Sequence, residues 1–268
     1  MLNDPVAVGA AAEALGQGVA VAHGFGNFYA LTARPEPDVV AAVNRLKGRP
    51  AGQVGSVTAV PERIVEVFDL ARLPAEIPEA RIRSLMEELF ALGPFGLRGP
   101  AADHMPAHLT AVQDGARTVQ VIAPGHRCPS NVFLAAAHRS AGSPYLFITS
   151  INRSRHTTGS DAEPAHWQAV GIRADFAGPI ADGRLYVLEH GDEAAALAVH
   201  PEHTPMSTTV LSFHHVPGSD TVGRPLLTLE RHGSLSAVRT GRIAARHGFA
   251  VTIGPGARDR LTVRNYQL

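Results

Sequence analysis

The chain has 268 residues, and 24 Lys and Arg balance 24 Asp and Glu, so its formal net charge is zero. This balance gives no global attraction to nucleic acid or to an anionic membrane, while a local basic cavity stays compatible with it. No run of about 18 apolar residues occurs, so we expect no membrane-spanning helix. The single cysteine, Cys128, excludes an internal disulfide. The first residues lack the basic segment of a secretory signal, and we therefore expect a cytoplasmic protein.

Helix signals recur from one end of the chain to the other. Asp4 is a good N-cap, followed by Pro5 at the first helical position, and Asp38 is expected to cap a second helix. Gly48 and Pro50 end that second helix. Apolar spacing and cap residues predict helices over residues 5–15, from 39 to the stop at 48, from 61, and over 79–92, 130–138, 164–172 and 236–247.

Short apolar runs between these helices predict strands. They cover residues 19–22, 56–60, 118–122, 145–149, 185–188, 208–213 and 226–229, with one more from residue 249. Residues 24–27 are predicted to be a flexible loop, and residues 94–116, rich in Gly, Pro and His, a longer one. Interleaved strands and helices predict an α/β protein. Because no linker is evident, we expect one domain over residues 1–268 with a short C-terminal extension.

Lys47 and Arg49 lie where the second helix stops. A cation at that point is stabilised by the negative end of the helix dipole, which is a purely structural explanation. The same two side chains also suit an anion, since Arg offers a planar fork for phosphate or carboxylate and Lys a mobile point charge. The residues alone allow both interpretations.

A second polar stretch, from Thr149 to Asn152, follows a predicted strand. Ligands of open α/β sheets bind outside the carboxyl ends of the strands, where hydroxyls and an amide can orient a sugar, a base or a carboxylate. Ser and Asn are equally common in ordinary turns, so a structural role is the alternative.

The stretch Leu46–Pro50 resembles the Lys-x-Arg-Pro signature of the YrdC-like family, which comprises the threonylcarbamoyl-AMP synthases and their carbamoyl-adenylating relatives. Further stretches resemble elements of that family in the same order along the chain. They are residues 18–21 with Tyr29 and Leu31, Gly93-Pro94, Ser150–Asn152, Ser207–Val210 and Arg231–Gly233. The resemblance covers about residues 16 to 235. It implies a twisted mixed sheet with flanking helices around a concave basic cavity.

The resemblance also implies an activity. In that family the nitrogen of an amino acid captures bicarbonate, and the carbamate attacks the α-phosphate of ATP, so that a carbamoyl-adenylate and pyrophosphate form. Mg²⁺ accompanies the ATP. By this resemblance the catalytic residues are Lys47 and Arg49, and the nucleotide-binding residues are Ser150, Asn152, Ser207 and Arg231.

Departures from the family pattern concern the acceptor. Gly24–Asn27 replaces a Pro-Thr-Asp-Thr-like loop, so Phe25, Asn27 and Tyr29 are the expected substrate-binding residues. If Phe25 faces the cavity, we expect an acceptor less polar or larger than threonine; the alternative is that Phe25 is a core residue. Ile122 stands where the family usually has an arginine. The cations that could compensate are Arg98, Arg127, Arg153 and Arg155.

The losses leave a second function open, a non-catalytic module that binds a nucleotide or RNA in the same cavity. Histidine is plentiful, yet no zinc site is expected. The neighbours His214 and His215 point to opposite faces of a strand, and Pro201 between His200 and His203 prevents the helical arrangement of a His-Glu-x-x-His site. We therefore expect a nucleotide and a small acceptor as ligands, and no metal held by the protein itself.

Overall fold

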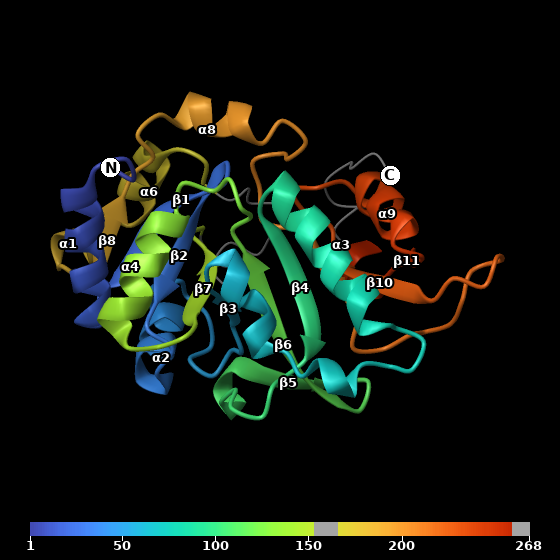
Figure 1. The fold of residues 1–268 in the computed structure, drawn as a ribbon. Helices are drawn as coiled ribbons and strands as arrows, with labels where there is room; N and C mark the ends of the chain where they lie inside the picture. Colours follow the sequence, from blue (N-terminus) through green and yellow to red (C-terminus); the bar gives the residue numbers. More distant parts are fainter. Residues whose placement is uncertain (153–165, 259–268) are drawn as a thin grey trace.

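The computed structural model describes residues 1–152 and 166–258. Over these residues the chain forms an eleven-stranded mixed sheet with helices packed against it (Figure 1). The strand order is β11-β10-β9-β4-β6-β3-β7-β2-β1-β8, and β5 pairs with β6. Parallel pairs (β1 with β8, β3 with β6, β4 with β9, β10 with β11) are mixed with antiparallel ones. The predicted α/β class is confirmed.

Most of the predicted helices and strands are present, while β4, β5, α7 and α8 were not predicted. The strands are β1 Ala20–Phe25, β2 Phe28–Ala33, β3 Ser56–Thr58, β4 Phe95–Pro100, β5 Thr110–Gln113, β6 Ala116–Ala123, β7 Leu146–Ser150, β8 Leu185–Leu188, β9 Val210–Ser212, β10 Leu226–Arg231 and β11 Ala250–Ile253. The α-helices are α1 Pro5–Gly16, α2 Pro37–Leu46, α3 Glu79–Leu92, α4 Asn131–Ala141, α6 Ala169–Asp175, α7 Ala177–Ala181, α8 Glu193–Val199 and α9 Ala237–Arg246. Short 3₁₀ helices cover η1 Pro61–Val67, η2 Leu70–Arg72 and η3 Ala107–Leu109.

Two helix starts differ from the prediction. The N-cap of α2 is Glu36, and Asp38 lies in the first turn, because Pro37 takes the first helical position. The helix expected over 164–172 is α6, which begins at Ala169; residues 164 and 165 lie outside the described part of the chain.

Half of the segment predicted as the loop 24–27 is strand. Gly24 and Phe25 belong to β1, which pairs antiparallel with β2 through Phe25 and Phe28, so only Gly26 and Asn27 form the turn. Gly26 has φ +63°, and a Cβ there would lie 2.1 Å from Pro94 Cγ. A two-residue hairpin with glycine at its first position is a tight turn, and the prediction of a flexible loop is wrong.

The predicted loop over 94–116 is also wrong, because it contains β4 and β5. Glycine and proline made β4 look like a loop, yet β4 pairs with β6 from Phe95 to Pro100 and with β9 on its other side. Both partners are distant in sequence, and such tertiary pairing overrides a weak local preference for strand.

The two faces of the sheet carry separate apolar clusters. The large core takes side chains from α2, α3 and α9, and the small core takes side chains from α1 and α4. Strand residues alternate between them: Tyr29 and Leu31 enter the large core, while Phe28 and Ala30 enter the small core. On the small-core face the apolar cluster ends at Ile122 and Val210. The polar side chains beyond that point form the site described below.

None of the helices in residues 1–152 and 166–258 combines the length and the apolar character needed to cross a bilayer. Among these helices, α3 has 14 residues, whereas a membrane span needs about 20.

Candidate functional site

A cavity of about 240 Å³ lies where β7 and β10 end, on the small-core face of the sheet. Its floor consists of strand residues, and its walls come from the segment after α2 and from the segment before β9. The described lining residues are Phe28, Ala30, Arg49, Gln53, Val54, Gly55, Ser56, Gln120, Ile122, Ile148, Thr149, Ser150, Ser207, Thr208 and Arg231. This position agrees with the rule that ligands bind at the carboxyl ends of strands.

Lys47 is the C-cap of α2 and is buried, with 2% of its surface exposed. Its Nζ donates to Thr149 Oγ1 at 3.1 Å and to the carbonyl oxygen of Ser150, so the lysine ties the end of α2 to the end of β7. Burial lowers the pKa of Lys47 well below its ordinary value, and the charges of Arg49 and Arg231 lower it further. Lys47 is thus a desolvated cation beside two other cations.

Arg49 and Arg231 reach the same cavity from opposite walls. Arg49 donates to Thr149 Oγ1 at 2.8 Å, and burial lowers its pKa. Arg231 donates from Nε to the carbonyl oxygen of Thr208 at 2.7 Å and from a terminal nitrogen to Thr208 Oγ1 at 2.8 Å. No Asp or Glu is among the described residues that line the cavity. Within the same part of the chain no carboxylate forms an ion pair with Lys47 or Arg49. The described lining of the cavity is therefore basic, as the resemblance implies.

Close backbone packing holds Arg231 in place. A Cβ at Gly233 would lie 2.3 Å from the Ser207 carbonyl oxygen and 2.4 Å from Thr208 C and Thr209 N. The Ser234 N–H donates to the Ser207 carbonyl oxygen at 2.9 Å. Only glycine allows this approach, which keeps the segment after β10 against the segment that carries Ser207.

Ser150 and Asn152 are adjacent in space as well as in sequence. Ser150 Oγ donates to Asn152 Oδ1 at 2.5 Å, and Ser150 lines the cavity. The structure therefore brings Lys47, Arg49, Ser150, Asn152, Ser207 and Arg231 together around one cavity or in direct contact with its wall. Which ligand group each of them contacts stays a prediction.

The three expected acceptor residues are placed elsewhere. Phe25 is fully buried in the small core and makes an edge-to-face contact with Phe28 at 5.6 Å between ring centroids. Asn27 Nδ2 donates to the His203 carbonyl oxygen at 2.7 Å. Tyr29 is buried on the large-core side, and its hydroxyl donates to Glu193 Oε1 at 2.9 Å.

None of these three residues is among those that line the cavity. For Phe25 the structure selects the core alternative. Phe28, which sequence reasoning passed over, lines the cavity instead. The missed signal was the period of two along β2, which puts residues 28 and 30 on one face and residue 29 on the other.

Of the arginines expected to compensate for Ile122, Arg98 and Arg127 are not among the described residues that line the cavity. Ile122 itself is a lining residue. Arg98 donates from Nε to Glu230 at 2.7 Å, and Arg127 is exposed outside the cavity. Arg153 and Arg155 lie outside the described residues.

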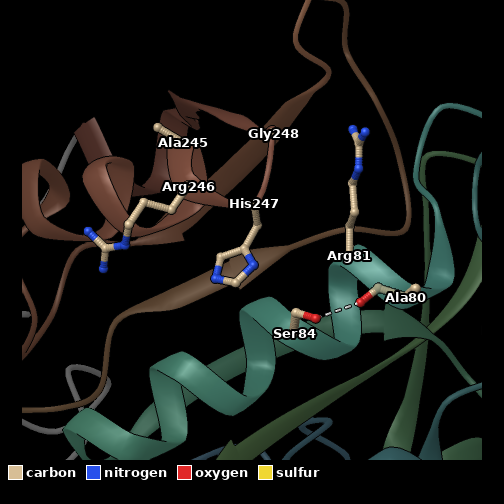
Figure 2. Close-up of a pocket in the computed structure, with 7 residues that line it drawn as sticks. All are labelled: Ala80, Arg81, Ser84, Ala245, Arg246, His247 and Gly248. Atoms are coloured by element: carbon tan, nitrogen blue, oxygen red, sulfur yellow. Dashed lines mark hydrogen bonds between the residues drawn. The ribbon is translucent and has the colours of Figure 1, made fainter.

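A second hollow in the described structure contains basic side chains, two of which are already paired. This hollow of about 460 Å³ lies between α3 and α9, and Figure 2 shows Arg81, Arg246 and His247 around it. Glu88 accepts hydrogen bonds from Arg246 and, at 2.7 Å, from His247, so two of these three groups already have an anionic partner. In the described part of the chain no group of three His, Cys, Asp or Glu side chains could hold a metal ion.

No protein-family model and no curated protein matches the amino-acid sequence. Solved structures do match the fold. Sua5 from P. abyssi, complexed with L-threonine, superposes with a TM-score of 0.62 at 21% identity over 91% of this chain and 58% of that chain. Protein smu.1377c of Streptococcus mutans gives 0.61 at 12% identity over 92% and 94% of the two chains. Full-length HypF, in a phosphate- and nucleotide-bound form, gives 0.53 at 16% identity over 82% and 28%.

The chain therefore has the fold of the Sua5/YrdC proteins, a large twisted mixed sheet flanked by helices. It spans 58% of the length of the P. abyssi Sua5 chain. At these identities the likeness defines the fold, and the chemistry has to be argued from the residues of the cavity.

Proposed function

We propose that this protein binds ATP and uses it, with bicarbonate and an amino acid or amine, to form a carbamoyl-adenylate. The observation that carries the proposal is that Arg49 lines the cavity and Lys47 lies buried against its wall, and neither has a carboxylate partner among the described residues. Desolvated like charges destabilise one another, and a polyanionic ligand removes that cost.

Two of the fold neighbours support this choice. The P. abyssi Sua5 structure is a complex with L-threonine, and the HypF structure holds phosphate and nucleotide. One protein that contains this fold thus binds an amino acid, and another, much longer chain that contains it binds a nucleotide. For this chain we propose both kinds of ligand.

In the proposed reaction the amine nitrogen bonds to the carbon of bicarbonate, water leaves, and a carbamate results. A carbamate oxygen then attacks the α-phosphorus of ATP, and the bond to the β-phosphate oxygen breaks, releasing pyrophosphate. Arg49 and Arg231 bind phosphate oxygens and stabilise the charge that develops on the leaving pyrophosphate. Ser207, Ser150 and Asn152 orient the nucleotide by hydrogen bonds.

Lys47 has a different part from the two arginines. It is almost fully buried and already donates to Thr149 and Ser150, so it fixes the end of β7 and adds positive potential to the cavity. An anion placed beside it raises its pKa toward the ordinary value, because opposite charge favours the protonated amine. ATP binding is then accompanied by proton uptake wherever Lys47 is partly neutral in the free protein.

Mg²⁺ has no carboxylate ligand among the described residues that line the cavity. Mg²⁺ commonly keeps several waters and binds through substrate phosphates. We propose that it enters with ATP, and we derive no step from a metal held by the protein.

The size of the cavity limits what it takes. At about 240 Å³ it is smaller than the roughly 300–1,000 Å³ of pockets that enclose drug-sized ligands. The phosphates and the acceptor fit this volume better than a whole nucleotide does. Phe28, Ile122 and Ile148 give the cavity an apolar side. We therefore still propose an acceptor less polar than threonine, and we assign the apolar contact to Phe28 instead of Phe25.

The test combines binding and turnover. Calorimetry should show ATP binding that weakens about tenfold or more in Arg49→Ala, since a hydrogen bond to a charged group is worth about 1.5–3 kcal/mol. Pyrophosphate release from ATP and bicarbonate should appear with at least one member of a panel of amino acids and amines. Unchanged ATP affinity in both Arg49→Ala and Lys47→Ala would remove the phosphate role. Binding without pyrophosphate release from any acceptor would remove the catalytic one.

A non-catalytic nucleotide- or RNA-binding module is the second candidate. One observation favours it: Ile122 lines the cavity where the resembling family usually has an arginine, and Arg98, on the neighbouring strand, is paired with Glu230. A chain that binds ATP with the expected arginine dependence, yet turns over no acceptor, is the outcome that selects this candidate.

A further inference from the structure

A row of polar side chains crosses the small-core face from β10, the strand next to the edge strand β11, into the cavity. We call it the polar ladder; its members are Glu230 on β10, Arg98 on β4, Gln120 on β6 and Ser56 on β3. Arg98 Nε donates to Glu230 Oε2 at 2.7 Å, and Arg98 also donates to Gln120 Oε1 at 2.7 Å. Gln120 Nε2 then donates to Ser56 Oγ at 2.6 Å.

The ladder has a fixed direction. A guanidinium carries only donors, so Arg98 has to contact the oxygen of the Gln120 amide, and the nitrogen of that amide has to face Ser56. The Ser56 oxygen is therefore an acceptor within the ladder. Its own O–H is the hydroxyl donor that the ladder leaves at the cavity end, beside the second N–H of the Gln120 amide.

Among the described residues around Ser56, none accepts a hydrogen bond from its hydroxyl. Ser56 is 9% exposed and lines the cavity, and across β7 its register partner is Ile148, an apolar residue. Over the described residues no hydrogen bond has Ser56 Oγ as its donor. A buried hydroxyl without an acceptor costs free energy, and a ligand oxygen at this position recovers it.

Ion pairing explains why the ladder ends in a neutral donor. The charge of Arg98 is balanced by Glu230, and the two side chains are 12% and 22% exposed. The ladder therefore orients the Ser56 hydroxyl but adds no net charge to the cavity. Arg49 and Arg231 supply the charge from the walls. Cationic side chains together with a neutral hydroxyl donor can bind the oxygens of an oxyanion such as phosphate.

We propose that Ser56 is a specificity-determining residue that donates its O–H to a phosphoryl oxygen of the ligand, and that Gln120, Arg98 and Glu230 are positioning residues that keep it a donor. This inference rests on the proposed function only in taking the ligand to be anionic; it does not depend on the adenylation step. Ser56 and the amide and guanidinium behind it belong to no motif of the resembling family identified in the sequence.

The reversal of the ladder is the sharpest test. In Gln120→Glu a carboxylate replaces the amide and has no N–H to donate, so Ser56 donates its proton to the new carboxylate and turns an oxygen lone pair toward the cavity. Ser56→Ala removes the hydroxyl, and Ser56→Thr keeps it. Gln113→Glu, on β5 and outside the cavity, is the matched control for the same change of charge.

Inorganic pyrophosphate is the probe, and its dissociation constant is measured by calorimetry on the full chain. We expect Ser56→Ala to bind it about tenfold to hundredfold more weakly than wild type. We expect Gln120→Glu to lose at least as much, and Ser56→Thr and Gln113→Glu to stay within about threefold. In the double variant Ser56→Ala/Gln120→Glu the effect of the glutamate is smaller than in the Ser56 background, because part of it acts through the hydroxyl.

Wild-type affinity in Ser56→Ala, with a clear loss in Arg49→Ala, overturns the role of Ser56 and leaves the anion site intact. If Gln120→Glu weakens pyrophosphate binding equally in the Ser56 and the Ser56→Ala backgrounds, the positioning role of Gln120 is overturned. The loss of affinity would then come from charge repulsion alone. Failure of the wild-type chain to bind pyrophosphate overturns this inference together with the anion site, whereas missing pyrophosphate release in the turnover assay affects the proposed reaction alone. Thermal melts of each variant check that it is folded.

Discussion

Gly233 connects the stability of the chain to the geometry of its cavity, and Gly233→Ala tests that connection. The alanine Cβ would lie 2.3 Å from the Ser207 carbonyl oxygen and 2.4 Å from two more backbone atoms. An ordinary contact needs at least 3.4 Å, so one of the two segments has to move by about 1 Å. Backbone atoms on both sides leave no flexible side chain to absorb the shift.

Overpacking in a well-packed region costs about 1–3 kcal/mol, occasionally more, and three backbone contacts place this case at the upper end. We expect a loss of about 3 kcal/mol in the free energy of unfolding, measured by urea denaturation followed by circular dichroism. For a chain of this size that corresponds to a fall in Tm of about 6–12 °C. Because Arg231 binds Thr208 in the displaced segment, ATP or pyrophosphate affinity should fall as well.

Gly241→Ala is the control, because it makes the same substitution inside α9, where a Cβ would meet nothing within 4 Å. Alanine is the better helix former, so this variant should be about 0.5–1 kcal/mol more stable than wild type. If Gly233→Ala unfolds at the wild-type urea concentration, or if both alanines shift stability in the same direction, the reasoning from close backbone contact is refuted.

Three further predictions concern side chains that the cavity does or does not use. Tyr29→Phe should lose about 1–3 kcal/mol of unfolding free energy, because the buried hydroxyl bridges the Glu193 carboxylate and the backbone N–H of the buried His190. A loss below about 0.5 kcal/mol in urea denaturation would contradict this. Phe25→Ala should lower the free energy of unfolding by about 3–5 kcal/mol without changing the order of preferred acceptors. Phe28→Ala should change that order. If only Phe25→Ala changes the acceptor preference, our assignment of the apolar contact to Phe28 is wrong. Burial lowers the pKa of His23 to about 3 and of His203 to about 4, below the ordinary 6.5, so the unfolded chain binds protons first. The free energy of unfolding should stay constant above about pH 6.5. Between pH 6.5 and about 4 it should fall by up to about 1.4 kcal/mol per pH unit for each histidine. Equal urea midpoints at about pH 7 and pH 5 would refute this prediction.

Apolar spacing and cap residues within a single helix were sufficient to locate several of the helices. The helices predicted over 130–138 and 236–247 are α4 and α9, and α3 has the predicted bounds Glu79–Leu92. Ser130 is the N-cap residue of α4, but its side chain makes no cap hydrogen bond. These signals depend on side chains within a few residues of each other, so no knowledge of the fold is needed to use them. The single-domain boundaries stay a prediction.

The sequence by itself also determined which cations and hydroxyls to consider for the cavity, because their order along the chain resembles a known family. It could not determine which face of β2 meets the cavity, and it therefore favoured Phe25 and Tyr29 over Phe28. Nor did it indicate β4, whose partners are about 20 and more than 100 residues away in the chain.

The polar ladder shows the same limit most clearly. Glu230, Arg98, Gln120 and Ser56 come from four strands, and their sequence neighbours give no reason to group them. Strand order and register put Arg98, Gln120 and Ser56 on successive paired strands, where aligned side chains meet, and Arg98 reaches past β9 to Glu230. The sequence supplied the charged residues of the cavity, and the tertiary structure decided the direction of the hydrogen bonds beneath them.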